Sequence, residues 1–170
     1  MWNVIRHLFL AIVIATLAAV TSGTAAAIPA GDARSEFRTA VGGTTADADM
    51  SNFSFTVTLP SGESRTMPAS MGKSGYETPT GTFTVIEKAR STTFDSRTIG
   101  IPLSSPEGYL LTGEYAVRLT WGGVFVHSAP WSVDSQGYAN VSHGCINLSP
   151  DDAAWYFANV NVGDPVTIHW

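Results

Sequence analysis

Residues 53–59 alternate strictly between apolar and polar side chains, in the order Phe-Ser-Phe-Thr-Val-Thr-Leu. A β-strand that buries one face produces this period of two. The turn residues Pro-Ser-Gly-Glu follow at 60–63, and a second extended stretch is predicted to about Met71. Strand composition returns in four later stretches: 82–88, 115–120, 123–127 and 165–170. The pattern therefore predicts a mainly β domain with a loop over 72–81.

One helix is predicted, and it starts directly after Ser149. Serine is a good N-cap, and the Pro-Asp-Asp run at 150–152 places proline at the first helical position and acidic groups at the positive end of the helix dipole. Residues 153–160 have the composition to continue the helix, and Gly163 with Pro165 ends it.

The first 27 residues have the order of a secretory signal peptide. Arg6 precedes an apolar run over 8–20, and small residues fill 21–27, so cleavage is expected before Ile28. The apolar run is about 13 residues, shorter than the roughly 20 that a membrane-spanning helix needs. An uncleaved signal that anchors the protein in the membrane is the main alternative, and a buried core helix is another.

The rest of the chain is predicted to hold one folded domain. Residues 28–50 are rich in Ala, Gly, Thr and Asp and are predicted to be a linker or loosely ordered segment, which leaves 51–170 as the domain. The net charge of −5 becomes −6 without residues 1–27, since Arg6 is the only charge there. This balance gives no electrostatic reason to expect nucleic acid or an anionic membrane surface as a partner.

Cys145 is the only cysteine of the chain, and it lies in the run Ser-His-Gly-Cys-Ile-Asn at 142–147. In an exported protein a lone thiol is a reactive group, half of an intermolecular disulfide, or an inert buried residue. A reactive thiol needs a basic or electropositive neighbour, because its pKa of about 8.5 leaves little thiolate at neutral pH. His143 is close in sequence, whereas His127 ends an apolar strand that would fix its position. We therefore predict His127 as the base.

The turn at Cys145 also supplies backbone N–H groups that could stabilise an oxyanion. Each good donor of this kind contributes about 3–4 kcal/mol to catalysis in other enzymes. No acidic residue lies at an obvious orienting position near His127. The carbonyl of Ser128 or the hydroxyl of Ser142 is expected to fix its tautomer instead.

These motifs resemble the signature of the L,D-transpeptidase catalytic domain, also called the YkuD domain. The signature joins His127 to the run at 142–147. Segment 78–83 (Thr-Pro-Thr-Gly-Thr-Phe) resembles the upstream loop and strand of the family, and three further segments resemble its actinobacterial, mycobacterium-like branch: 105–109, 123–132 and 147–150. The resemblance covers about 53–170. The family's usual opening strand is not found, because 35–50 is polar and Gly-rich.

The resemblance implies a β-sandwich fold with a catalytic cysteine on a loop. It also implies a reaction in which the bond between the third residue, an L-centre, and the fourth, a D-alanine, of a peptidoglycan tetrapeptide stem is cleaved. The stem remains as a thioester on Cys145, and an amine of a second stem attacks to give a 3→3 cross-link. Carbapenems are expected to acylate the same sulfur.

The family pattern assigns roles by motif position. Cys145 is the nucleophile, His127 is the proton donor and acceptor, and Ser128 orients His127. His143 and Gly144 line the oxyanion hole together with the Cys145 N–H. Five further residues match positions that contact the peptide stem: Tyr109, Gly122, Gly123, Trp131 and Asn147. No metal or cofactor is expected.

Structural roles are the alternative for several of these residues. His143 could only support its loop, and Tyr109 and Trp131 could be core or rim aromatics. The two glycines could serve backbone geometry, and Asn147 could close a turn.

Three alternative functions stay open. An L,D-carboxypeptidase would use the same acyl-enzyme with water as acceptor, and a protein-anchoring enzyme would use an envelope protein. A non-catalytic metal or wall-binding module would use His127, His143 and Cys145 as ligands, although the fourth ligand of a closed zinc site is not apparent. In each case we expect an exported protein, either of the periplasm or cell wall or secreted.

Overall fold

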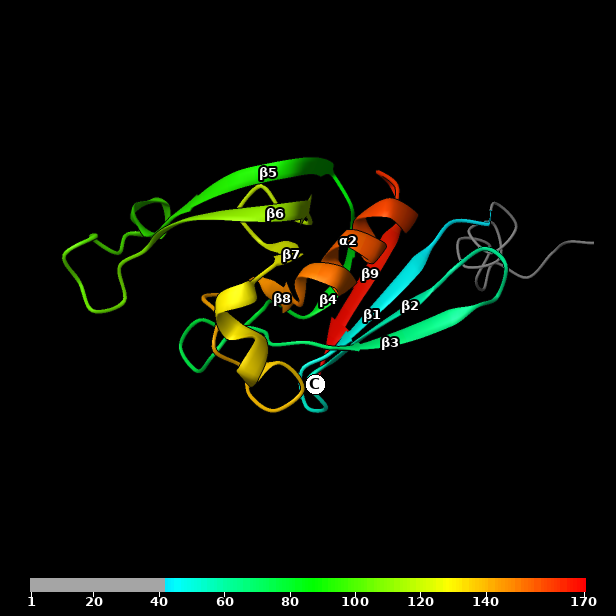
Figure 1. Ribbon diagram of the computed structural model, residues 1–170, viewed down its shortest axis with the longest axis horizontal. Coiled ribbons are helices and arrows are strands. Elements are labelled where there is room, and N and C mark those ends of the chain that lie inside the picture. Colours follow the sequence, from blue (N-terminus) through cyan, green and yellow to red (C-terminus); the bar gives the residue numbers. More distant parts are fainter. Residues whose placement is uncertain (1–41) are drawn as a thin grey trace, which may run out of the picture. The chain divides into compact units, whose positions relative to one another are not determined.

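The computed structural model describes residues 42–170, which form two β-sheets and, within that range, one α-helix (Figure 1). The first sheet has the order β3 (Ser64–Pro68), β2 (Ser54–Thr58), β1 (Thr45–Asp49), β9 (Pro165–His169) and β4 (Gly81–Thr84). The second has the order β5 (Glu87–Asp95), β6 (Leu110–Arg118), β7 (Phe125–Ser128) and β8 (Ile146–Leu148). The helix is α2 (Pro150–Asn159), and two 3-10 helices span Ser96–Ile99 and Pro130–Ser135. The predicted mainly β fold is confirmed, and the predicted signal peptide lies outside the described residues.

The strand predicted from strict alternation is β2. Phe55 and Val57 are fully buried, while the alternate residues Ser54, Thr56 and Thr58 are partly exposed. Phe55 lies opposite Met67 of β3, which is also buried, so the two strands bury the same face. The apolar positions of 53–59 therefore supply one side of the core.

The prediction of a linker over 28–50 is wrong at its end, because residues 45–49 form β1. This strand lies inside the first sheet, where it pairs antiparallel with β2 and parallel with β9. It buries Ala46 and Ala48 between polar residues that are exposed or partly exposed, and Met50 after it is fully buried. The strand escaped prediction because its buried face carries only alanine. It is the opening strand that the sequence seemed to lack, and the domain begins before residue 51.

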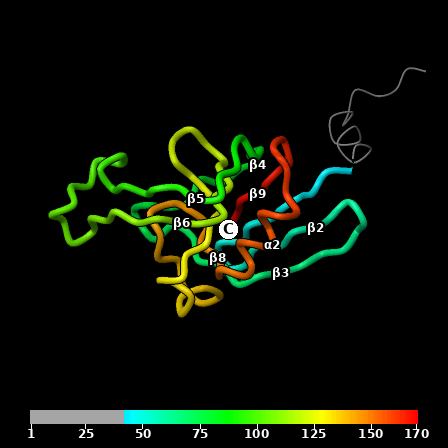
Figure 2. Tube along the Cα trace, turned by 45° about the horizontal axis from the view of Figure 1, so that its top comes forward, coloured from blue at the N-terminus to red at the C-terminus, as the bar shows by residue number. Residues whose placement is uncertain are grey.

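The β5–β6 hairpin is longer than the sequence predicted. Its pairing runs from Glu87 opposite Arg118 to Asp95 opposite Leu110, and the hairpin and its connection extend to one side in both views (Figures 1 and 2). No residue of β5 between Glu87 and Asp95 is fully buried, so no apolar alternation marks the strand. In β6 the alternation is interrupted where Tyr115 takes a positive φ of 53°.

Helix α2 begins where the sequence predicted. The Ser149 side chain accepts a hydrogen bond from the Asp152 N–H and caps the helix, and Pro150 is the first helical residue. The helix contacts both sheets. The ring of Tyr156 meets Phe55 of β2 edge-on at 4.9 Å, and Phe157 lies 5.8 Å from Tyr115 of β6.

Replacing Tyr156 with phenylalanine is expected to stabilise the protein. The ring is fully buried, and its hydroxyl has no hydrogen-bond partner among the described residues. An unsatisfied buried hydroxyl costs free energy, so removing it while keeping the contact with Phe55 should raise the free energy of unfolding by about 1 kcal/mol. Urea denaturation would measure this, with Tyr138→Phe as a control because Tyr138 is exposed. A loss of stability in Tyr156→Phe alone would show that the hydroxyl is satisfied, for example by a buried water.

Candidate active site

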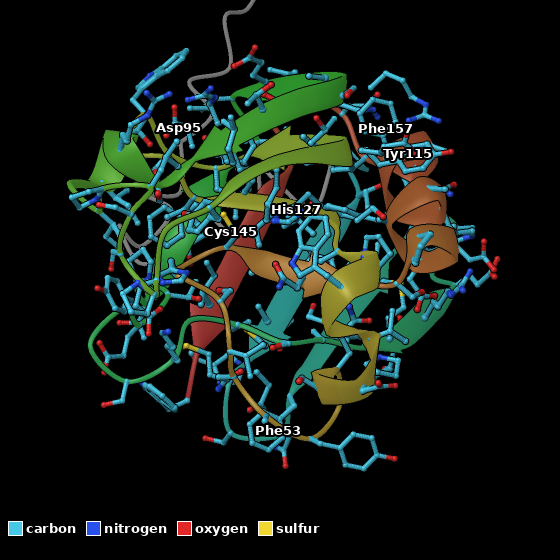
Figure 3. The ribbon with its side chains drawn as sticks, turned by 60° about the vertical axis from the view of Figure 1, so that its left-hand side comes forward. Phe53, Asp95, Tyr115, His127, Cys145 and Phe157 are labelled. Carbon is cyan, nitrogen blue, oxygen red and sulfur yellow. The ribbon has the colours of Figure 1, made fainter. Side chains whose placement is uncertain are left out.

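His127 and Cys145 are brought together by the parallel pairing of β7 and β8. His127 lies opposite Asn147, and Val126 lies opposite Ile146, so Cys145 comes one position before the paired stretch, level with Phe125. Paired positions project toward the same face of a sheet. His127 and Cys145 both line a cavity of about 680 Å³ on this face (Figure 3). The strand therefore holds the predicted base beside the loop that carries the thiol.

The loop that carries Cys145 is fixed by the segment that follows β3. Ser70 and Asn147 exchange two backbone hydrogen bonds of 3.1 and 2.8 Å, and the Ser142 N–H donates to the Met71 carbonyl at 2.9 Å. The Lys73 N–H in turn donates to the Ser142 carbonyl at 3.0 Å. These bonds hold the loop on both sides of the thiol.

The imidazole of His127 is buried and neutral. Its Nδ1 lies 2.8 Å from the Ser128 carbonyl oxygen, so Nδ1 carries the proton and donates it, which leaves Nε2 as an acceptor. The ring of Phe94 lies 4.4 Å away and that of Trp131 5.9 Å away. Burial lowers the pKa of His127 to about 4, and the hydrogen bond to Ser128 opposes this shift. Of the two groups expected to fix the tautomer, the Ser128 carbonyl occupies the position.

The thiol of Cys145 is also uncharged at neutral pH. Its sulfur lies 3.5 Å from the Gly123 carbonyl oxygen, and the residue is half-buried at the cavity. Burial raises the pKa of Cys145 to about 11, although a hydrogen bond with the Phe125 backbone opposes the shift. The resting pair is therefore a thiol and a neutral imidazole, and a thiol in this state would need a base to act as a nucleophile.

Ser142 shapes the turn around the thiol. Its hydroxyl donates to the Cys145 carbonyl at 2.6 Å and accepts from the Gly144 N–H at 3.1 Å. Gly144 has φ of 117°, a conformation that favours glycine. The Gly144 N–H is thus occupied, whereas the N–H groups of His143 and Cys145 make no hydrogen bond within 42–170. These two groups are the ones left to hold an oxyanion, and Gly144 serves the backbone turn.

His143 belongs to a cluster that joins three loops. Its Nε2 lies 2.8 Å from Oε2 of Glu107, which also pairs with the ammonium of Lys73. Lys73 and then His143 hold the pKa of Glu107 below its usual range. The His143 ring contacts Tyr76 at 4.7 Å and Tyr109 at 5.1 Å. This arrangement suits support of the loop better than proton transfer, and it leaves His127 as the candidate base.

The five residues predicted to contact substrate all line the cavity of His127 and Cys145: Tyr109, Gly122, Gly123, Trp131 and Asn147. Trp131 is 48% exposed at its rim, and burial raises the pKa of Tyr109. Asn147 is buried, and its Nδ2 donates to the Ser132 hydroxyl at 3.1 Å. Ser128 and Gly144 do not line the cavity. The carbonyl of Ser128 binds His127, and Gly144 forms the turn before the thiol.

Other residues at the site were not predicted. Phe94 packs on His127, Glu107 binds His143, and Arg118 lines the cavity. Phe94 and Arg118 lie in no motif, and Glu107 lies in segment 105–109 without a role assigned to it. Strand pairing and loop folding bring all three to the site.

The described residues also limit other kinds of site. Within 42–170 no three His, Cys, Asp or Glu side chains form a group that could hold a metal ion. No helix in this range is long and apolar enough to cross a membrane.

Comparison with known proteins agrees with the geometry. The family model of the YkuD "L,D-transpeptidase catalytic domain" matches residues 43–168. The chain belongs to this family. The predicted resemblance is thereby confirmed.

Mycobacterial L,D-transpeptidases are among its similar relatives. L,D-transpeptidase 1 of Mycobacterium tuberculosis is 64% identical over 121 residues, which cover 71% of this chain and 48% of the relative. A solved L,D-transpeptidase from Mycobacterium smegmatis is 62% identical with a TM-score of 0.74, covering 76% of this chain and 59% of the other. The structure of LdtMt1 in complex with imipenem is 61% identical with a TM-score of 0.73, covering 75% and 59%. The chain thus spans about half the length of the curated relative.

Proposed function

We propose that this protein is a peptidoglycan L,D-transpeptidase that forms 3→3 cross-links through a thioester on Cys145. The observation that carries the proposal is the placement of a buried neutral imidazole, with its tautomer fixed, on the same cavity as the only thiol. Family membership supports the same reaction, and a peptidoglycan substrate supports a location at the cell wall, in agreement with the predicted export signal.

The reaction begins when Nε2 of His127 takes the thiol proton as the sulfur attacks the carbonyl of the third stem residue. The N–H groups of His143 and Cys145 would stabilise the oxyanion. His127 then gives the proton to the nitrogen of the scissile bond, D-alanine leaves, and the acyl group stays on sulfur. An amine of a second stem attacks the thioester, loses its proton through His127, and releases the thiol.

The neutral resting pair suits this sequence. A buried imidazolium could not accept the thiol proton, and a pKa of about 4 keeps His127 unprotonated at neutral pH. The tetrahedral intermediate requires no metal.

The acceptor separates the proposed reaction from its alternatives. Incubation of the full chain with a disaccharide-tetrapeptide, followed by mass spectrometry, should yield dimers that have lost one D-alanine. Tripeptide monomers without dimers would instead indicate an L,D-carboxypeptidase. If neither product forms but a supplied envelope protein becomes joined to the stem, the enzyme anchors proteins. If no product forms with any acceptor, the proposed chemistry is wrong.

The same thiol is the proposed site of acylation by carbapenems. The similar protein LdtMt1 has been solved in complex with imipenem. A strained β-lactam carbonyl would meet the same nucleophile, base and oxyanion donors as the stem.

A further inference from the structure

Arg118 lies in one row with the nucleophile. It is the last residue of β6 and lies opposite Phe125 of β7, which is level with Cys145 next to β8. The three side chains project toward the same face, and all three line the cavity. Two strand spacings place the Cα atoms of Arg118 and Cys145 about 10 Å apart.

The guanidinium is held in place by aromatic rings. Its Cζ lies 4.4 Å from the ring centre of Phe125 and 5.5 Å from that of Trp121. The Arg118 side chain is 25% exposed. Its stem is therefore covered while part of the group still faces the cavity, which is the arrangement of a preorganised anion-binding group.

The donors of Arg118 are largely unused. Nε lies 2.8 Å from Oε2 of Glu87, but the contact lacks hydrogen-bond alignment, and Nε is buried without a hydrogen-bond partner. Within the described residues, neither Nη1 nor Nη2 makes a hydrogen bond to protein. A guanidinium fork can bind both oxygens of a carboxylate through such paired N–H groups.

No other fixed cation competes for an anion in this cavity. Arg118 is the one Lys or Arg among the described residues that line it. Asp95 also lines it, but this carboxylate is bound by Arg97 at 2.6 Å. Glu87 pairs with the Nε side of Arg118 and is half-exposed, so a negative group on the substrate would be drawn toward the free Nη groups of Arg118.

We propose that Arg118 binds the C-terminal carboxylate of the D-alanine that leaves the donor stem. This inference rests on the proposed function, because the position of the substrate follows from attack by Cys145. When the scissile carbonyl is at the sulfur, the carboxylate of the next residue lies about one residue length, about 3.8 Å, beyond it. The guanidinium stacks over Phe125, whose position is level with Cys145 on the neighbouring strand, so it lies on the same side of the cavity as the thiol.

The consequence is selection of the donor by length. A tetrapeptide stem ends one residue after the scissile bond, and its terminal carboxylate would lie at Arg118. A pentapeptide stem places an uncharged peptide group there and carries its carboxylate about 3.8 Å farther on. Arg118 would thus make the enzyme prefer tetrapeptide donors and cleave only the terminal residue.

The test compares donors that differ in the proposed contact. The full chain and its Arg118→Gln variant are given a disaccharide-tetrapeptide with a free carboxylate, the same stem ending in D-alaninamide, and the pentapeptide stem. Release of the leaving group is measured: D-alanine from the acid donor, D-alaninamide from the amide donor, and a dipeptide from the pentapeptide. We expect kcat/KM for the acid donor to fall about 10- to 100-fold in Arg118→Gln, the loss typical of a charge-assisted hydrogen-bonded pair. The amide donor should be poor for both proteins, with no further loss in the variant.

The matched control is Arg90→Gln. Arg90 lies on the same hairpin, pairs with Glu114 at 3.3 Å and does not line the cavity. It should leave the preference for acid over amide unchanged. The inference is wrong if Arg118→Gln lowers kcat/KM equally for the acid and amide donors. It is also wrong if the variant leaves the ratio of tetrapeptide to pentapeptide cleavage unchanged.

The stem can also carry a carboxylate on the side chain of its third residue. A donor with that side-chain carboxylate amidated tests whether Arg118 binds it instead of the C-terminal carboxylate. If the effect of Arg118→Gln disappears with this donor, the side chain is the ligand and the inference is wrong.

Binding gives a readout that does not depend on turnover. In a Cys145→Ala background, calorimetry should show that Arg118→Gln weakens binding of the acid stem 10-fold or more and leaves the amide stem unaffected. Binding of this kind without product from the wild type would count against the proposed function alone. Product without any acid-dependent binding would count against the role of Arg118 alone.

Discussion

Replacing Cys145 with alanine is expected to abolish both cross-linking and carbapenem acylation. No other cysteine exists in the chain to take over the attack. Removing the nucleophile of an acyl-transfer enzyme lowers kcat by about 10⁴-fold or more, because only binding and oxyanion stabilisation remain. Intact-mass spectrometry should show one carbapenem added to the wild type and none to Cys145→Ala. The same variant should form no dimers from a disaccharide-tetrapeptide.

The fold of Cys145→Ala should be retained, which makes the result specific. The residue is half-buried, and its sulfur makes only weak contacts with backbone: 3.5 Å to the Gly123 carbonyl and a hydrogen bond with the Phe125 backbone. The turn itself is held by Ser142, which binds the backbone of residue 145 and of Gly144. Thermal unfolding should therefore be close to that of the wild type. An adduct that persists in the variant would place the acylated group elsewhere and refute the role of Cys145.

The fold could be predicted where the pattern of side chains reports burial directly. Residues 53–59 alternate because one face of β2 is buried, and helix α2 follows its cap at Ser149. Strand β1 could not be found in this way. Its buried positions carry Ala46 and Ala48, whose small side chains resemble those of a linker. Only the partners on both sides, β2 and β9, show that it is a central strand.

The residues of the site likewise fall into those that the sequence could predict and those that it could not. His127 and the run at 142–147 could be predicted because thiol chemistry needs a base, and a strand followed by a turn can supply one. The parallel register of β7 and β8, which sets the two side chains level with one another, is not written in either segment. Nothing in the sequence distinguishes Arg118 and Glu107 from the other charged residues of the chain. They join the site through the pairing of Arg118 with Phe125 and through the folding of Glu107 against His143.

Replacing His127 with glutamine is expected to slow acylation about 10³- to 10⁴-fold at pH 7 and to change its dependence on pH. With the pKa of Cys145 at about 11, about one thiol in 10,000 is ionised at pH 7, so the variant must react through this small fraction. In the wild type, neutral His127 is expected to take the proton as the bond forms and to remove this limit. General bases of this kind contribute about 10²- to 10⁴-fold.

The pH profile separates a base from a residue that only packs. Because burial lowers the pKa of His127 to about 4, the wild-type rate of carbapenem acylation should be level from about pH 5 to pH 9. It should fall as the pH drops through 4, where the imidazole becomes protonated. The His127→Gln variant should lose this acid limb and should instead gain about tenfold per pH unit, until the thiol ionises near pH 11.

Phe94→Leu provides the matched control for this prediction. It alters the packing against His127 but keeps the imidazole, so its profile should retain the wild-type shape even if its rate is lower. Stopped-flow fluorescence at a saturating carbapenem concentration would measure the rates.

A wild-type profile that rises tenfold per pH unit through neutrality would mean that free thiolate is the attacking species in both proteins, and that His127 does not act as the base. A level profile in His127→Gln would be equally contrary, since it would require another group to take the thiol proton. Among the described residues, the other histidine that lines the cavity is His143, which is bound to Glu107. The double variant His127→Gln/His143→Gln would then show whether that group had taken over the proton.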